Sequence, residues 1–110
     1  MSEISIAALP SSERPRDRLI ELGPQALSNA ELISLLFRTG VKGSNSIELA
    51  QKLLTQYNGL PGIQRMSVSN LLAFHGLGIT KAATLKAAIE LGRRLTLEPY
   101  NARLSIRERV

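Results

Sequence analysis

A glycine-rich stretch in the second half of the chain holds the residues best suited to binding an anion. Two glycines flank one leucine, and a short segment that ends in a lysine follows. The six residues are Gly76, Leu77, Gly78, Ile79, Thr80 and Lys81. If a helix begins near Ile79, its first N–H groups have no partner within the helix and lie at the positive end of its dipole. Such a helix start binds a phosphate without any special side chain. The Thr80 hydroxyl and the Lys81 ammonium would add two donors.

The same glycines also have a purely structural explanation. Glycine adopts positive φ at no steric cost, so residues 76–78 make a sharp turn between two helices with or without a ligand. In either case we expect Leu77 to point inward and to fill the gap between the helices. A phosphate contact would recognise shape and charge rather than base sequence, and its affinity would fall as salt is added.

A second loop repeats part of this pattern. It offers Gly40, Lys42, Gly43 and Ser44, which form a possible second phosphate-binding turn. Its glycines are three residues apart rather than two, and the stretch lacks the spacing of a nucleotide-binding P-loop.

The sequence offers no set of residues for catalysis. Its single histidine, His75, cannot supply a metal-binding pair, and no Ser–His–Asp combination is recognisable. We therefore predict no catalytic residue, no metal and no cofactor, and a stand-alone enzyme is the least favoured class. His75 borders the glycine turn, where it is most simply a surface residue.

Basic residues near the start of the chain indicate local pairing. Arg14, Arg16 and Arg18 are interleaved with Glu13 and Asp17, which favours ion pairs within that segment over a DNA-binding patch.

The net charge of +5 fits a nucleic-acid partner, but a solvated basic surface explains it equally well. Arg93 and Arg94 fall near the end of the last expected helix, where cations suit the negative end of the dipole.

Composition favours a small helical domain. Hydrophobic residues make up 44% of the chain and aromatic residues only 4%, so leucine, isoleucine and alanine must supply most of the core. We expect Phe37, Tyr57 and Phe74, which occupy apolar helical positions, to join it. The absence of cysteine excludes disulfides. No apolar run approaches the ~20 residues of a membrane span and no secretory signal is visible, so we expect a cytoplasmic protein.

Periodicity and helix-ending residues predict an all-α chain of five helices and a short sixth connector. The helices are expected at about residues 15–22, 29–39, 46–57, 68–74 and 79–98, and the connector at 60–66. Ser28 with Glu31, and Asn45 with Glu48, have the spacing of capping boxes. Gly40 fits the left-handed residue that ends the second helix.

The two halves of the chain resemble each other. LSNAELISLLFRTGVKGSNSIELAQKLL and MSVSNLLAFHGLGITKAATLKAAIEL each contain a capped helix, a glycine-containing loop and a second helix. This predicts two helix–hairpin–helix units, of the kind found in SAM domains and in the second domain of RuvA, with the first unit degenerate. The domain would span 14–98 and follow a flexible N-terminus at 1–13.

The chain resembles the N-terminal domain of the RadC family, also called the UPF0758 proteins. The resemblance lies in ERPRDRLIELGPQALSNAELISLLFRTG, SIELAQKLL and LLAFHGLGITKAATLKAAIELGRRL, which together cover about residues 13–95. It implies a helix–hairpin–helix domain, a disputed role in DNA repair, and a DNA contact at residues 76–78 and Lys81. Relatives often have proline where this chain has Ile79, so the helix start is expected to be less rigid here.

Full-length members of that family resemble this domain followed by a JAB/MPN-type zinc metallopeptidase domain. That domain is absent here, so no protease activity is expected. Residues 99–110 would form the linker toward it or an unstructured end.

Two functional hypotheses follow. The first is a non-catalytic module that binds the DNA backbone without sequence preference. The alternative is a protein-docking or regulatory module for the metallopeptidase domain. A continuous positive band through both hairpins would favour the first, and an apolar patch of several hundred Å² would favour the second.

Overall fold

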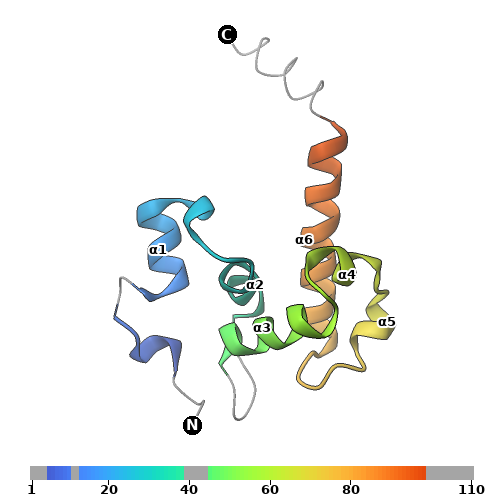
Figure 1. Ribbon diagram of the computed structural model, residues 1–110, viewed down its shortest axis with the longest axis horizontal. Coiled ribbons are helices and arrows are strands. Elements are labelled where there is room, and N and C mark those ends of the chain that lie inside the picture. The colour runs from blue at the N-terminus through green and yellow to red at the C-terminus, as the bar shows by residue number, and fades with distance from the viewer. Residues whose placement is uncertain (1–4, 11–12, 39–44, 99–110) are drawn as a thin grey trace.

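The computed structural model of the protein describes residues 5–10, 13–38 and 45–98, and these residues fold into helices (Figure 1). The α-helices of this part of the chain are α1 (Pro15–Leu22), α2 (Asn29–Phe37), α3 (Ser46–Gln56), α4 (Leu60–Arg65), α5 (Val68–Leu71) and α6 (Ile79–Leu97), with 3-10 turns η1 (Ile6–Ala8) and η3 (Pro24–Ala26). No strand occurs among these residues. The prediction of an all-α fold is therefore confirmed.

Side chains start two of the helices as the sequence predicts. The Ser28 hydroxyl accepts a hydrogen bond from the Glu31 N–H at 3.1 Å, and the Glu31 carboxylate accepts one from the Ser28 N–H at 2.9 Å. Asn45 and Glu48 make the same reciprocal pair at the start of α3, at 2.8 and 3.1 Å. Each pair satisfies two N–H groups that a helix start leaves without partners. Both predicted capping boxes are confirmed.

Two helices end earlier than predicted. Helix α2 stops at Phe37, because Arg38 itself takes a positive φ of 68° while its N–H still bonds to the Ser34 carbonyl. The prediction that α2 continues to a glycine cap at Gly40 is therefore wrong, and Gly40 lies outside the described residues. Helix α5 stops at Leu71 rather than Phe74, since the chain there closes short turns through i→i−3 bonds.

The core is formed mainly by aliphatic side chains from α2 to α6. Its buried members are Ala30, Ile33, Phe37, Leu49, Ala50, Leu53, Ile63, Leu71, Leu77, Ala82 and Leu85. Tyr57 and Phe74 are half-buried against it, with ring centroids 6.3 Å apart. The three aromatic residues predicted for the core are thus confirmed. An isolated helix of fewer than ~12 residues is marginal in water. The short helices of this domain remain folded because each packs its apolar side chains into the shared core.

Helix α1 is attached to the rest by Arg18. Its guanidinium pairs with Glu31 at the start of α2 and donates a hydrogen bond to the Ala26 carbonyl at 2.9 Å. The predicted pairing within the first segment is confirmed only for Arg14, whose Nη1 lies 3.9 Å from an Asp17 oxygen. For Arg18 the prediction is wrong, because η3 folds α2 back alongside α1 and offers a partner on the next helix.

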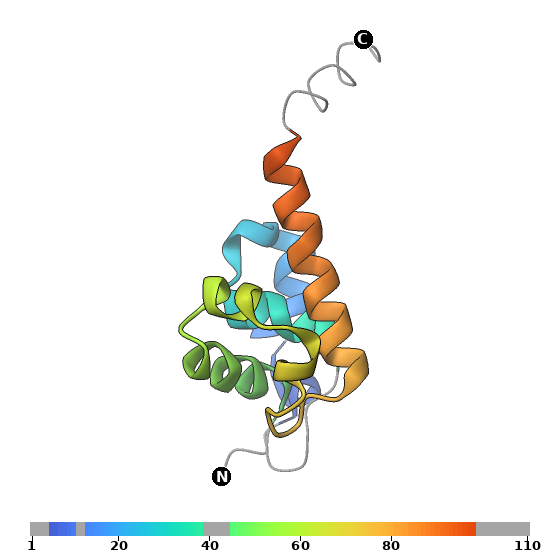
Figure 2. The ribbon, with the colours of Figure 1, turned by 90° about the vertical axis from the view of Figure 1, so that its right-hand side faces the viewer.

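Helix α6 is the longest helix of the described residues, and its C-terminal half extends beyond the others (Figures 1 and 2). Arg93 and Arg94 both pair with Glu90 on the same helix, at 2.8 and 3.0 Å. These contacts agree with the expectation of a solvated helix end.

The proposed ends of the domain stay predictions. A 3-10 turn at Ile6–Ala8 and a hydrogen bond from Arg14 Nε to the Leu9 carbonyl at 2.8 Å lie in or beside the expected flexible N-terminus. Residues 99–110 lie outside the described part. None of the helices described is long and apolar enough to cross a membrane.

Candidate anion-binding sites

The glycine turn lies between α5 and α6, at the lower end of the molecule in Figures 1 and 2. Gly76 has a φ of 91°, a conformation that favours glycine, and the Leu77 N–H bonds to the Phe74 carbonyl at 3.1 Å. Leu77 is 3% exposed and belongs to the core. The prediction that Leu77 points inward is confirmed.

Gly78 differs from Gly76. Its φ of −75° and ψ of 175° are extended values that any residue adopts, so positive φ is needed only at Gly76. A Cβ built on Gly78 would meet no heavy atom within 4 Å. The missing side chain therefore leaves the backbone open on the outside of the turn, beside the start of α6.

Helix α6 begins at Ile79, as predicted, and its first bond runs from the Ala82 N–H to the Gly78 carbonyl at 3.0 Å. No side chain caps this start. Helices α2, α3 and α5 begin with a side-chain cap, and α1 and α4 have a proline in the first two positions. Among the α-helices described, α6 alone has neither. The N–H groups of Ile79 and Thr80 have no acceptor within the helix and are consequently available to an external acceptor.

The side chains beside this start are accessible to different degrees. Ile79 and Thr80 are exposed, Lys81 is half-buried, and His75 is exposed on the other side of the turn. Solvent therefore reaches both Thr80 and the open backbone of Gly78.

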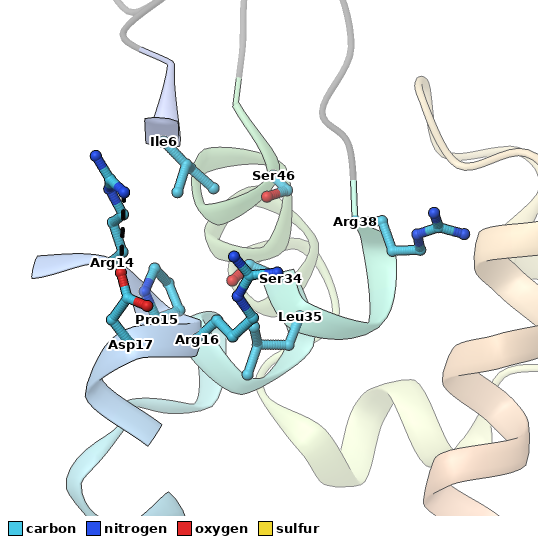
Figure 3. A pocket seen from close by; sticks show the side chains of 9 residues that line it. All are labelled: Ile6, Arg14, Pro15, Arg16, Asp17, Ser34, Leu35, Arg38 and Ser46. Carbon is cyan, nitrogen blue, oxygen red and sulfur yellow. Dashed lines mark ion pairs between the residues drawn. The ribbon is translucent and has the colours of Figure 1, made fainter. Parts of the chain in front are cut away.

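The second predicted turn, with Gly40, Lys42, Gly43 and Ser44, lies outside the described residues. Arg38 and Ser46, on either side of that loop, line a pocket that no sequence pattern indicated (Figure 3). This pocket is formed where α1 and α3 begin and α2 ends. Its charged members come from residues 14–17 and Arg38, which are separated along the chain, so no local motif could indicate it.

Some basic residues have structural roles. The Lys86 ammonium donates a hydrogen bond to the Gln64 carbonyl at 2.6 Å and so satisfies the C-terminal end of α4. Arg18, Arg93 and Arg94 are engaged by carboxylates. Among the described residues, no group of three histidine, cysteine, aspartate or glutamate side chains could hold a metal ion.

The chain matches the family model described as UPF0758 N-terminal over residues 6–83. A UPF0758 protein of Caldanaerobacter subterraneus is 52% identical over 103 residues, covering 94% of this chain and 44% of the relative. A UPF0758 protein of Chloroflexus aurantiacus is 44% identical over 107 residues, covering 97% of this chain and 47% of the relative. The chain thus spans less than half the length of these relatives, and no solved structure matches it. On these matches, the chain belongs to the UPF0758 family, as the N-terminal region of such proteins.

Proposed function

We propose that this domain is a non-catalytic module that binds the DNA backbone without sequence preference, with α5, the glycine turn and α6 acting as a helix–hairpin–helix unit. The observation that carries the proposal is the uncapped start of α6 beside the open backbone of Gly78. Backbone N–H groups at a helix start bind phosphate oxygens, and the helix dipole adds to the attraction.

Independence from base sequence follows from what the turn offers. Reading a base edge requires side chains that reach into a groove, whereas the donors here are mainly main-chain N–H groups and the short Thr80 side chain. Phe74, the aromatic residue nearest the turn, packs against the core and is engaged by Tyr57. Affinity should therefore depend on phosphate contacts and fall steeply as salt is added.

Placing a negative side chain at the turn is expected to abolish most of this binding. Gly78→Glu should weaken DNA binding roughly tenfold or more, because a carboxylate would occupy the phosphate position and repel its charge. The fold should survive, since the φ of Gly78 suits any residue and its Cβ direction is open. The measurement is fluorescence anisotropy of labelled duplex, single-stranded and branched DNA at low and near-physiological salt, with circular dichroism to verify folding.

Gly92→Glu is the matched control. It adds the same charge to the same helix at a position where a Cβ also meets nothing within 4 Å. Its affinity should stay close to that of the wild type. Equal affinities for folded Gly78→Glu and wild-type protein, or no binding of any DNA by the wild type at low salt, would rule the proposal out.

A second candidate function is docking of a protein domain, and the observation that favours it is the far half of α6. Leu91 and Leu95 are one helical turn apart and are 68% and 73% exposed. At ~100° per residue they share a side of the helix with Ala88 and Gly92, away from Arg93. The occupant proposed is the metallopeptidase-like domain that the family resemblance implies for longer chains.

Leu91→Glu is expected to disrupt such docking. In titrations of this chain with the separately produced remainder of a full-length relative, the affinity should fall roughly tenfold or more, because a charge would be buried in an apolar contact. Ile20→Glu is the control, since Ile20 is 73% exposed but lies on α1. Equal effects of the two substitutions in calorimetry, or no binding by the wild type, would count against docking.

A further inference from the structure

The pocket between α1, α2 and α3 is lined by charged and hydroxyl-bearing side chains. Its volume is about 380 Å³. Six of its residues carry charges or hydroxyl groups, and they are Arg14, Arg16, Asp17, Ser34, Arg38 and Ser46. Among the described residues that line the pocket, three carry a positive charge, one carries a negative charge and two carry hydroxyls. The net charge of these walls is positive and suits an anion.

The two serines differ in what their hydroxyls do. Ser34 is 3% exposed, and its hydroxyl donates a hydrogen bond to the Glu31 carbonyl at 2.6 Å. Ser46 is 2% exposed, and its hydroxyl has no hydrogen-bond partner among the described residues. No side-chain oxygen or nitrogen of the described residues is both fully shielded from solvent and without a partner, so the Ser46 hydroxyl keeps some contact with the pocket. Because Ser46 lines the pocket, an acceptor placed there would provide a partner.

The arginines of the pocket also differ in whether their side chains have a partner. Arg14 is engaged by Asp17 and by the Leu9 carbonyl. The side chains of Arg16 and Arg38, both exposed, make no ion pair or hydrogen bond with the described residues. Figure 3 shows the Arg16 side chain beside Ser34 in the centre of the pocket, with Arg14 and Asp17 on one side and Arg38 on the other. Arg16 thus presents an unengaged guanidinium next to the buried serines.

The N-terminus of α3 adds to the positive electrostatic potential of the pocket. Ser46 is the first residue of this helix of 11 residues, so the positive end of its dipole borders the pocket. The capping box uses the N–H groups of Asn45 and Glu48. The N–H groups of Ser46 and Ile47 take no part in the capping box and have no acceptor within the helix.

From this arrangement we infer that the pocket binds a phosphate group. The planar guanidinium of Arg16 can hold two phosphate oxygens at once, and the Ser46 hydroxyl can donate to a third. Arg38 adds a second positive charge to the walls of the pocket, although its guanidinium extends away from Arg16 in Figure 3. The pocket leaves room for more than phosphate alone, so the group can be a small phosphate ester or the terminal phosphate of a nucleic acid. This site uses other helices than the glycine turn and does not depend on the proposed function.

The first test is a titration of the whole chain with inorganic phosphate at constant ionic strength, followed by ¹⁵N NMR. Saturable shifts are expected at the Ser46 and Ile47 amides. Arg16→Gln should weaken binding roughly tenfold, the effect of losing one charge-assisted pair. Ser46→Ala should weaken it roughly threefold or more for the loss of one hydrogen bond. Gly92→Glu, which lies outside both sites, should leave it unchanged.

Arg65→Gln is the control for the loss of a charge alone, because Arg65 is exposed on α4 and does not line the pocket. Shifts that do not saturate, an unchanged dissociation constant for folded Arg16→Gln, or an equal loss with Arg65→Gln would overturn the inference.

Oligonucleotides with and without a 5′-phosphate then distinguish the two sources. A preference for the phosphorylated end that disappears in Arg16→Gln would identify a nucleic-acid terminus. Equal binding of both oligonucleotides, with phosphate binding intact, would identify a small phosphate ester.

Discussion

Gly62→Ala is expected to lower the free energy of unfolding by about 3 kcal/mol or more, enough to unfold much of a domain of this size. A Cβ on Gly62 would stand 1.5 Å from the Tyr57 carbonyl oxygen and 2.7 Å from its carbon. These are backbone atoms, so the clash cannot be relieved by rotating a side chain. Helix α4 would have to move as a whole, and Ile63, which is fully buried, would leave its place in the core.

Gly92→Ala provides the matched comparison. A Cβ there meets nothing within 4 Å, and the residue lies inside α6. Alanine should therefore stabilise the protein by about 0.5–1 kcal/mol through its higher helix propensity. Urea unfolding followed by circular dichroism measures both variants. A midpoint for Gly62→Ala equal to that of the wild type would mean that α4 does not pack on Tyr57 as described.

Glu31→Gln is expected to lower the free energy of unfolding at pH 7 by about 2 kcal/mol. Glutamine can still accept the Ser28 N–H in the capping box, so the start of α2 should persist. The change removes the negative charge that faces Arg18, whose side chain is only 24% exposed. The guanidinium would then be largely buried with a neutral partner. Glu90→Gln is the control, since its pairs with Arg93 and Arg94 lie on one solvent-exposed helix, where such pairs contribute little.

The effect of Glu31→Gln should depend on pH. Burial of the carboxyl raises the pKa of Glu31, but hydrogen bonds from the Ser28 backbone and from Arg18 outweigh this and leave the pKa below its ordinary value. A lowered folded pKa gives stability that is complete above the unfolded value of about 4.3 and is lost as the pH falls through the folded value. The difference between wild type and variant should therefore shrink below about pH 4. A difference that stays constant down to pH 3 would contradict this account.

Local features of the fold could be predicted because their causes lie within a few residues. The capping boxes, the inward Leu77 and the start of α6 at Ile79 each depend on neighbours along the chain. The end of α2 was misplaced because glycine is the usual residue just after a helix, whereas here the helix ends at Arg38, with a φ of 68° and a ψ of −47°.

Contacts between helices could not be predicted in this way. Arg18 has acidic neighbours in sequence, yet it pairs with Glu31 because η3 turns the chain back on itself. The pocket likewise joins the start of α1, the end of α2 and Ser46, and only their packing makes them neighbours. At the glycine turn the shape was predictable, because the positive φ of Gly76 and the inward Leu77 depend on residues next to each other in the sequence.

The length of α6 also sets the distance between the glycine turn and the exposed leucines of the same helix. The 19 residues of this helix span about 27 Å from Ile79 to Leu97. A continuous helix resists bending, so α6 holds the glycine turn at one end and the exposed leucines toward the other at a fixed separation. A domain seated on those leucines would be held at a set distance and rotation from a phosphate bound at the turn. Lengthening α6 by one residue would turn that domain by about 100° relative to the turn, whereas inserting a full turn would mainly shift it along the axis.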